Sequence, residues 1–240
     1  MSIAGKLSAA PILQEPFPHL ICDDVLPDDL YRRVLDALPM DDPSDGFAYF
    51  RLDDATEPLQ ELEALWQREI FGAIVDRLLR YAATMFFEAT GNDPDEKLGR
   101  ALSRDDFMAG GILQHRTSGQ VHGAHLDGAG ALFTSVIYLC KPDADARDGT
   151  IFFNPVRPQR LLDGYRQRRN LGAWFIANWQ PLFEEAKRVD YVANRMVAFV
   201  GPPHSWHGVA VGHNKHRHSV QTTCRLKQDP LAQIFDGWSR

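Results

Sequence analysis

Three side chains that can bind a metal stand in two short motifs far apart in the sequence. His125 and Asp127 are separated by one residue, and His207 lies well downstream, directly before a glycine and an apolar run. Residues i and i+2 of a β-strand face the same side, so the first motif would direct an imidazole and a carboxylate into one space. Two imidazoles and one carboxylate form the facial triad that binds non-haem Fe(II) and leaves positions open. The three residues therefore predict a metal site with room for oxygen chemistry.

Each motif also has a plainer interpretation. His-x-Asp occurs often by chance, as a surface ion pair or as a buried hydrogen-bonded pair. His204 is a second candidate for the downstream ligand, but it follows two prolines and is expected in a loop. His207 precedes an alternating apolar run that is typical of a strand, so we take His207 as the ligand.

A candidate anion site follows ten residues after His207. Arg217 and Ser219 would share one face of a strand, and a guanidinium fork beside a hydroxyl suits a carboxylate. The alternative is a solvent-exposed arginine at the end of a sheet. The histidine-rich segment 213–218 could suggest a second metal site, but a polar turn between two strands is the preferred interpretation.

Composition limits the classes of protein to consider. The chain has 240 residues, with 44% hydrophobic and 24% charged residues and a formal net charge of -6, which is ordinary for a soluble globular protein. This charge gives no electrostatic reason to expect nucleic acid or an anionic membrane as a partner. Cys22, Cys140 and Cys224 are far apart, which favours a reducing compartment. With no long apolar stretch and no convincing signal peptide, a cytoplasmic location is expected.

The hydrophobic pattern changes along the chain and predicts an α+β protein forming a single domain over 1–240. Residues 1–106 are expected to give an N-terminal strand and helical support, and 107–227 a β core. Within the first part we expect a loose arm at 1–17, strands at 18–23 and 47–52, a helix at 28–38 and a long helical segment at 57–89 with a break near 68–71. Short apolar runs predict core strands at 108–114, 120–126, 132–140, 150–153, 190–192, 195–200, 208–211 and 219–226.

Several residues are candidates for contact with a substrate. The 154–194 insertion interrupts the core strands and is expected to act as a lid or specificity element, because long insertions are usually functional or disordered. Its Trp174 and Trp179 could stack on a substrate or simply bury the insertion. Its arginine-rich helix could bind an anion or face solvent. Arg116 and Gln114 share one face of the strand before His125, where Arg116 could face a substrate or form a structural ion pair.

Taken together, the order His-x-Asp, His, Arg-x-Ser resembles the 2-oxoglutarate and Fe(II)-dependent oxygenases, specifically the prolyl-4-hydroxylase-like branch. The resemblance covers roughly residues 108–227, about half of the chain. Four further segments are similar to segments of that family: Gln114–Asp127, the apolar strand Ser135–Leu139, Asp148–Phe153 (with Thr150 in place of the usual acid) and the opening Pro16–Pro27.

The resemblance implies a fold and a reaction. The fold would be a double-stranded β-helix, a jelly-roll or cupin-like core with the N-terminal helices packed on one face. Fe(II) would be held by His125, Asp127 and His207, with 2-oxoglutarate as co-substrate and O2 as oxidant. Arg217 would pair with the far carboxylate of 2-oxoglutarate, with Ser219 and Tyr138 as helpers, although Tyr138 could also be a core residue. The Asp127 carboxylate favours hydroxylation, or an allied oxidation such as desaturation or ring closure, over halogenation.

The expected activity is hydroxylation of an unactivated C–H bond of a small metabolite, such as an amino acid or a biosynthetic intermediate, with release of succinate and CO2. One alternative is a hydroxylase acting on a protein or a carrier-bound peptide side chain. Another is a jelly roll that binds metal without catalysis. The expected partner is a small-molecule substrate, with neither nucleic acid nor membrane, and a homodimer is compatible with the sequence.

Overall fold

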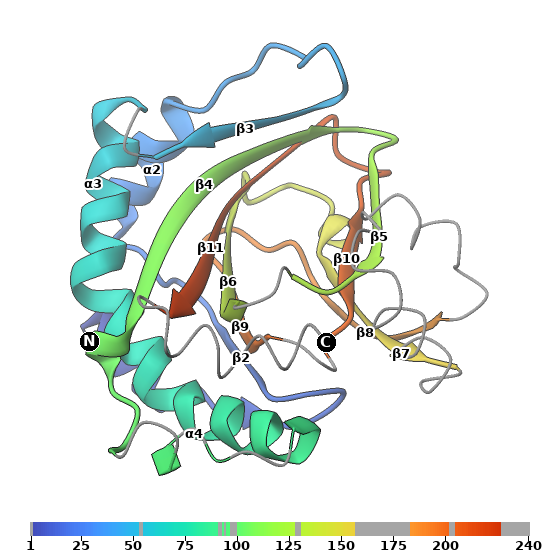
Figure 1. Cartoon of the computed structure of the whole chain (residues 1–240). Coiled ribbons are helices and arrows are strands. Elements are labelled where there is room, and N and C mark those ends of the chain that lie inside the picture. The colour runs from blue at the N-terminus through green and yellow to red at the C-terminus, as the bar shows by residue number, and fades with distance from the viewer. Residues whose placement is uncertain are drawn as a thin grey trace.

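The computed structural model describes residues 2–52, 55–90, 93, 95–96, 100–127, 131–156, 183–201 and 205–226, with no account of the side chains of 85–90 and 226. Its helices lie along one side of a large sheet, and a smaller sheet lies on the other side (Figure 1). The helices are α1 (Ile3–Ala9), α2 (Asp28–Asp36), α3 (Glu57–Leu65) and α4 (Phe71–Thr90). A π-helical segment, Trp66–Ile70, joins α3 to α4, and short 3-10 turns span Arg104–Asp106 and Ala146–Asp148.

The described strands form two antiparallel sheets. The seven-stranded sheet has the order β1-β2-β9-β6-β11-β4-β3, and the four-stranded sheet has the order β5-β10-β7-β8. The bounds in the large sheet are β1 Ile12–Leu13, β2 His19–Cys22, β9 Met196–Val200, β6 Ala131–Leu139, β11 His216–Leu226, β4 Phe107–Thr117 and β3 Phe47–Arg51. The bounds in the small sheet are β5 Val121–His125, β10 His207–Ala210, β7 Thr150–Pro155 and β8 Phe183–Val189.

The core strands pair in a nested way. β4 pairs with β11, β5 with β10, β6 with β9 and β7 with β8. The strands β8 to β11 therefore pair with β7 to β4 in reverse order. From β4 to β11 the strands alternate between the large and the small sheet, except that β7 and β8 both lie in the small sheet. This arrangement is consistent with a jelly-roll core, and it confirms the α+β class expected from the sequence.

Strand alternation gives the large sheet two different faces. In β4, Leu113 packs on the helices, whereas Gln114 and Arg116 line a pocket between the sheets. The helix-facing core joins all four helices to the sheet through Ile3, Leu7, Leu30, Val34, Leu59, Leu62, Ile74, Leu78, Leu113, Phe133, Ile137 and Val220. A second apolar cluster between the sheets contains Phe17, Val136, Tyr138, Phe152, Tyr191, Val197 and Phe199.

Two local predictions from the sequence are wrong. The segment expected as a loose arm at 1–17 is ordered from residue 2 onward: α1 buries Ile3 and Leu7, and the Gly5 amide donates to the Ser2 hydroxyl at 3.1 Å, which caps the helix. The strand expected at 190–192 lies at 183–189 instead, as the polar edge strand β8. The expected break near 68–71 is confirmed as the π-helical segment. Residues 157–182 of the predicted insertion lie outside the described residues.

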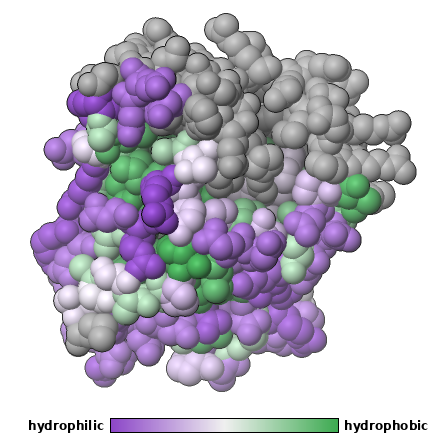
Figure 2. Space-filling view, turned by 90° about the horizontal axis from the view of Figure 1, so that it is seen from below, coloured by the Kyte–Doolittle hydropathy of each residue, from purple (hydrophilic) through white to green (hydrophobic). Residues whose placement is uncertain are grey.

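The surface seen from below is mostly hydrophilic where it is described, with hydrophobic residues in smaller groups between hydrophilic ones (Figure 2). Among the described residues, no helix combines the length and the hydropathy needed to cross a membrane.

Candidate metal centre and its pocket

His125, Asp127 and His207 come together at one end of the small sheet. His125 ends β5 and His207 begins β10, and the two are register partners in the antiparallel pair. Their imidazole nitrogens and an oxygen of Asp127 all lie within 4.8 Å of one another, with 3.7 Å between His207 Nε2 and Asp127 Oδ2. Among the described residues this is the one group of three or more such side chains that could hold a metal ion.

The backbone fixes how both histidines face the centre. The Nδ1 atoms lie 2.9 Å from the Gly123 carbonyl oxygen for His125 and 2.8 Å from the Ser205 carbonyl oxygen for His207. A carbonyl oxygen only accepts, so each Nδ1 carries the proton and each Nε2 presents a lone pair. The Thr134 hydroxyl donates to Asp127 Oδ2 and holds that carboxylate in place. These contacts are the outer support that metal ligands need.

A third histidine, His122, also faces the centre, and sequence reasoning missed it. His122 Nε2 lies 3.1 Å from His125 Nε2, and the two ring centroids are 3.9 Å apart. Regular alternation would place residues i and i+3 on opposite faces of a strand. A register shift between His207 and Val209 changes this: Val209 pairs with His122, whereas His207 pairs with His125. The His-x-x-His spacing is visible in the sequence, but the irregularity is not.

Burial keeps the imidazoles of His125 and His122 neutral. Desolvation, followed by the nearby His207, lowers the pKa of His125 well below its ordinary value. Desolvation, followed by the charge of Arg116, lowers the pKa of His122 to about 4. A neutral imidazole is the form that binds a metal, so His125 is ready to act as a ligand at neutral pH.

Arg217 is buried on the face of β11 that looks into the same pocket, with 2% of its surface exposed. Its Nε donates to the Asp148 carbonyl oxygen at 2.8 Å, and its Nη1 donates to Ser219 Oγ at 3.0 Å. The guanidinium lies over the rings of Tyr138 and Tyr191, 5.5 and 5.3 Å from their centroids. No salt bridge involves it among the described residues. The expected pair of Arg217 and Ser219 is therefore brought together in a buried position.

The Asp148 side chain, which sequence reasoning did not single out, fixes the turn that precedes Arg217. Its carboxylate accepts hydrogen bonds from the backbone amides of Gly212, His213 and Asn214 at 2.7 to 3.2 Å. The Asn214 side chain also donates to it at 2.9 Å. A polar turn is therefore found where the sequence analysis preferred one. Asp148 holds that turn through its carboxylate and Arg217 through its carbonyl oxygen.

The structure places Tyr138 beside Arg217 but directs its hydroxyl elsewhere. Tyr138 is fully buried, and its hydroxyl donates to Thr150 Oγ1 at 2.8 Å and accepts from the Thr150 amide at 3.0 Å. Its ring supports the guanidinium through a cation–π contact.

Arg116 and Gln114 line the pocket with the triad, as expected for residues sharing one face of β4. Arg116 is 4% exposed, and its Nη2 donates to Tyr49 Oη at 2.9 Å. Gln114 Nε2 donates to Gln221 Oε1 on β11. The other substrate candidates, Trp174 and Trp179, and the rejected ligand His204 lie outside the described residues.

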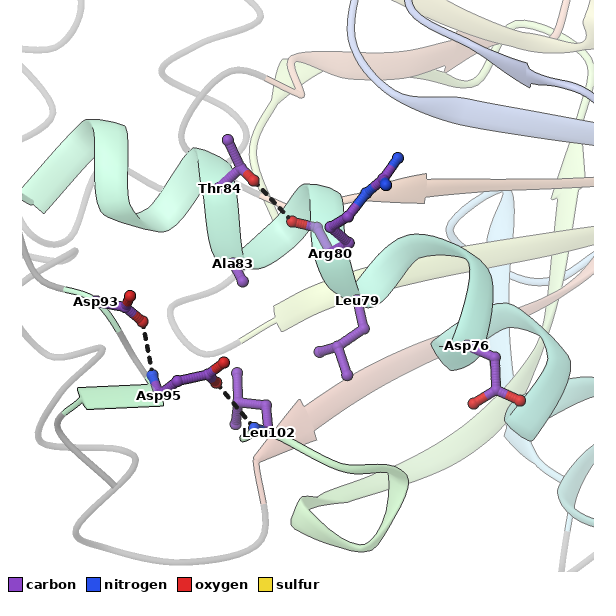
Figure 3. A pocket seen from close by; sticks show the side chains of 8 residues that line it. All are labelled: Asp76, Leu79, Arg80, Ala83, Thr84, Asp93, Asp95 and Leu102. Atoms are coloured by element: carbon purple, nitrogen blue, oxygen red, sulfur yellow. Dashed lines mark hydrogen bonds between the residues drawn. The ribbon is translucent and has the colours of Figure 1, made fainter. Parts of the chain in front are cut away.

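The pocket that contains the triad has a volume of about 320 Å³. A larger hollow of about 510 Å³ lies beside α4 and has a different character (Figure 3). Its Asp95 carboxylate accepts the Leu102 amide at 2.8 Å, and Asp93 accepts the Asp95 amide at 2.9 Å. These carboxylates are engaged in shaping their own loop, so we assign the chemistry to the smaller pocket.

Comparison with known proteins supports the fold. No protein-family model matches the sequence, and no curated protein matches it. A structure of prolyl 4-hydroxylases from Phytophthora capsici is 18% identical over 99% of this chain and 73% of that chain, with a TM-score of 0.53. A 2OG-Fe(II) oxygenase-family oxidoreductase from Burkholderia pseudomallei is 11% identical over 94% of this chain and 90% of that chain, with a TM-score of 0.50. The fold is therefore similar to that of 2-oxoglutarate/Fe(II) oxygenase structures, as the resemblance noted in the sequence implies.

Proposed function

We propose that this protein is an Fe(II)- and 2-oxoglutarate-dependent dioxygenase that hydroxylates an unactivated C–H bond of a small metabolite, with release of succinate and CO2. The observation that carries this proposal is one pocket containing both the His125, Asp127 and His207 group and the buried Arg217. The volume of about 320 Å³ is in the range of small-molecule sites and supports a small substrate. The nested strand pairing supports the finer proposal of a double-stranded β-helix within a single domain.

The donor set fits ferrous iron. Two imidazole nitrogens and one carboxylate oxygen converge, their supporting hydrogen bonds are in place, and three ligands leave positions open for other molecules. When bound, the iron and the keto acid supply the oxidising chemistry, and the protein supplies position and exclusion of water.

Each residue then has a defined task. His125, Asp127 and His207 hold the metal. Arg217 binds the far carboxylate of 2-oxoglutarate with its remaining donors, and Ser219 holds the guanidinium in position. The rings of Tyr138 and Tyr191 keep water from the guanidinium, which strengthens its interaction with an anion. Because Asp127 supplies a carboxylate, hydroxylation is favoured over halide transfer.

The test is an anaerobic visible spectrum of the metal-free protein on addition of Fe(II) and then 2-oxoglutarate. We expect a metal-to-ligand charge-transfer band that is absent in His125→Ala. In Arg217→Gln the band requires at least about tenfold more 2-oxoglutarate, because a hydrogen-bonded charge is lost. His213→Ala, which removes an exposed histidine, is the matched control and should leave the band unchanged.

A folded wild-type protein that gives no band would sink the proposal. The non-catalytic alternative predicts Fe(II) binding without any spectral response to 2-oxoglutarate. A band that persists in His125→Ala would mean that the triad is assigned to the wrong residues.

A further inference from the structure

We infer that the pocket contains a second anion site at Arg116, and that the substrate is a small molecule carrying a carboxylate that binds there. The inference deepens the proposed function and rests on it in one respect: Arg217 is taken to be occupied by the co-substrate.

The surroundings of Arg116 lack a counter-charge. The residue is 4% exposed, yet no described carboxylate forms a salt bridge with it. Its hydrogen-bond partner is the neutral hydroxyl of Tyr49, and its Nε is buried without any partner. Buried arginines are normally paired, because an unpaired buried charge is costly. Because Arg116 lines a ligand-sized pocket, an anionic ligand could supply the counter-charge that the described residues do not.

The neighbouring strand β11 adds a second positive charge beside Arg116. Arg116 is the register partner of Arg217 in the antiparallel pair of β4 and β11, so two cationic side chains lie directly opposite each other on one face. Like charges directly opposite in a sheet are destabilising. Since both residues line the same pocket, two anionic groups, one for each guanidinium, would relieve this repulsion.

Charge balance in the pocket supports an anionic substrate. Its lining contains two buried arginines, Arg116 and Arg217, one exposed arginine, Arg225, whose charge solvent screens, and one carboxylate, Asp127. A divalent metal adds positive charge, and the dianionic co-substrate offsets only part of the total. The lining stays positive with iron and 2-oxoglutarate in place, which attracts a negatively charged substrate.

The site is also open to an incoming molecule. The Arg116 guanidinium lies 5.8 Å from the ring centroid of Phe47 and 5.7 Å from that of Tyr49. These two aromatic residues stand on the edge strand β3 and are 40% and 48% exposed. They therefore form a rim through which a carboxylate can reach the guanidinium while the rest of the molecule extends towards the triad. The planar fork of arginine matches a carboxylate in two parallel hydrogen bonds.

The experiment measures binding of matched acids and amides to Zn(II)-loaded protein saturated with 2-oxoglutarate, by saturation-transfer NMR. Zinc is diamagnetic, and saturating 2-oxoglutarate blocks Arg217. The probes are pentanoate, 3-phenylpropanoate and L-leucine, each paired with its carboxamide. We expect at least one acid to bind in preference to its amide. In Arg116→Gln that acid should bind roughly tenfold to a hundredfold more weakly, because a charge-assisted contact is removed.

Two variants serve as comparisons. Arg225→Gln removes the same charge from an exposed position of the same pocket and should change acid binding by less than about threefold, because solvent screens it. Arg116→Lys keeps the charge without the fork and should bind the acid with intermediate affinity. Thermal unfolding gives the readout of a purely structural role: Arg116→Gln should melt at or above the wild-type temperature, because it removes an unpaired buried charge.

The outcomes separate this inference from the proposed function. If no acid binds in preference to its amide, or if Arg116→Gln unfolds the protein, the second anion site is wrong whatever the charge-transfer spectrum shows. If Arg116→Gln weakens 2-oxoglutarate binding and Arg217→Gln does not, the two arginines have exchanged roles and the inference is overturned. If the spectrum shows no co-substrate band but acids still require Arg116, the proposed function fails and the anion site stands.

Discussion

The two faces of the seven-stranded sheet differ in chemical character although they share the same strands. The face towards the helices is closed mainly by aliphatic and aromatic side chains, whereas the face towards the small sheet carries arginines, glutamines and hydroxyls around the pocket, beside a smaller apolar cluster. The helix face provides burial energy, whereas the pocket face holds charges that cost stability until a ligand binds. The same backbone hydrogen bonds support both faces. A substitution on one face can therefore alter stability without altering ligand binding, or the reverse.

Adjacent residues on β4 give the sharpest test of this division. Leu113 is 1% exposed on the helix face, and Gln114 is 8% exposed on the pocket face. Leu113→Ala should lower the free energy of unfolding by about 2–5 kcal/mol, because it leaves a cavity in the core. Gln114→Ala should lower it by about 1 kcal/mol or less. Urea denaturation of both variants measures the difference. Equal losses would show that the two faces contribute alike.

A second pair of variants tests the neighbours of Arg217 on the pocket side. Ser219→Ala removes the hydroxyl that binds Arg217 Nη1 at 3.0 Å and should raise the half-saturating concentration of 2-oxoglutarate about tenfold. Tyr138→Phe removes a hydroxyl that bonds to Thr150 at 2.8 Å and should cost about 1 kcal/mol of stability with little change in co-substrate binding. Spectroscopic titration with 2-oxoglutarate checks both expectations. A large loss of co-substrate binding in Tyr138→Phe would instead support the direct helper role for Tyr138.

The helix-facing side also contains a histidine cluster, which should make stability depend on pH. His218 stacks on His115 with ring centroids 4.2 Å apart, and its Nε2 lies 2.8 Å from the Pro39 carbonyl oxygen. Burial, followed by the nearby His115, lowers the pKa of His218 to about 4. Between about pH 6.5 and pH 4, His218 is therefore protonated in the unfolded chain but stays neutral in the folded chain. Stability is full above about pH 6.5 and falls as the pH drops towards 4.

Urea denaturation at pH 7 and pH 5 measures this loss. His218→Gln should lose less stability between the two pH values than the wild type, because glutamine does not titrate. His213→Gln changes an exposed histidine and should follow the wild type. If His218→Gln and the wild type show the same difference, the pH dependence arises elsewhere, such as at His115 or His122.

The sequence predicts most of the fold because its core strands alternate or are continuously apolar. β6 is buried along its whole length and spans Ala131–Leu139, against a predicted range of 132–140. β11 has alternating faces and spans His216–Leu226, so it begins earlier than the predicted range of 219–226. β8 was misplaced because an edge strand with the sequence Phe-Glu-Glu-Ala-Lys-Arg-Val has few apolar residues. α1 was missed because a seven-residue helix is stabilised by its packing and cap, which propensity does not reveal.

The candidate site could be predicted where local spacing sufficed. His125 and Asp127, or Arg217 and Ser219, need only i, i+2 alternation. The tertiary register decides the rest. His122 enters the site through a register irregularity, and Asp148 supports Arg217 across the two sheets. Neither relation follows from spacing along one strand, because each depends on which strands become neighbours.

The nested strand pairing also determines when the candidate metal centre can assemble during folding. Phe107 at the start of β4 pairs with Leu226 at the end of β11. Likewise, β5 cannot pair until β10, which lies far downstream in the sequence, has been synthesised. Such distant partners make a chain of high contact order, in which large loops must close before the contacts stabilise them. A nascent chain on the ribosome has His125 and Asp127 long before it has His207 or Arg217. Under the proposed function, the oxygen-reactive centre is therefore assembled after the strands that enclose it have been synthesised, so a half-made chain is spared the damage that loosely held iron would cause.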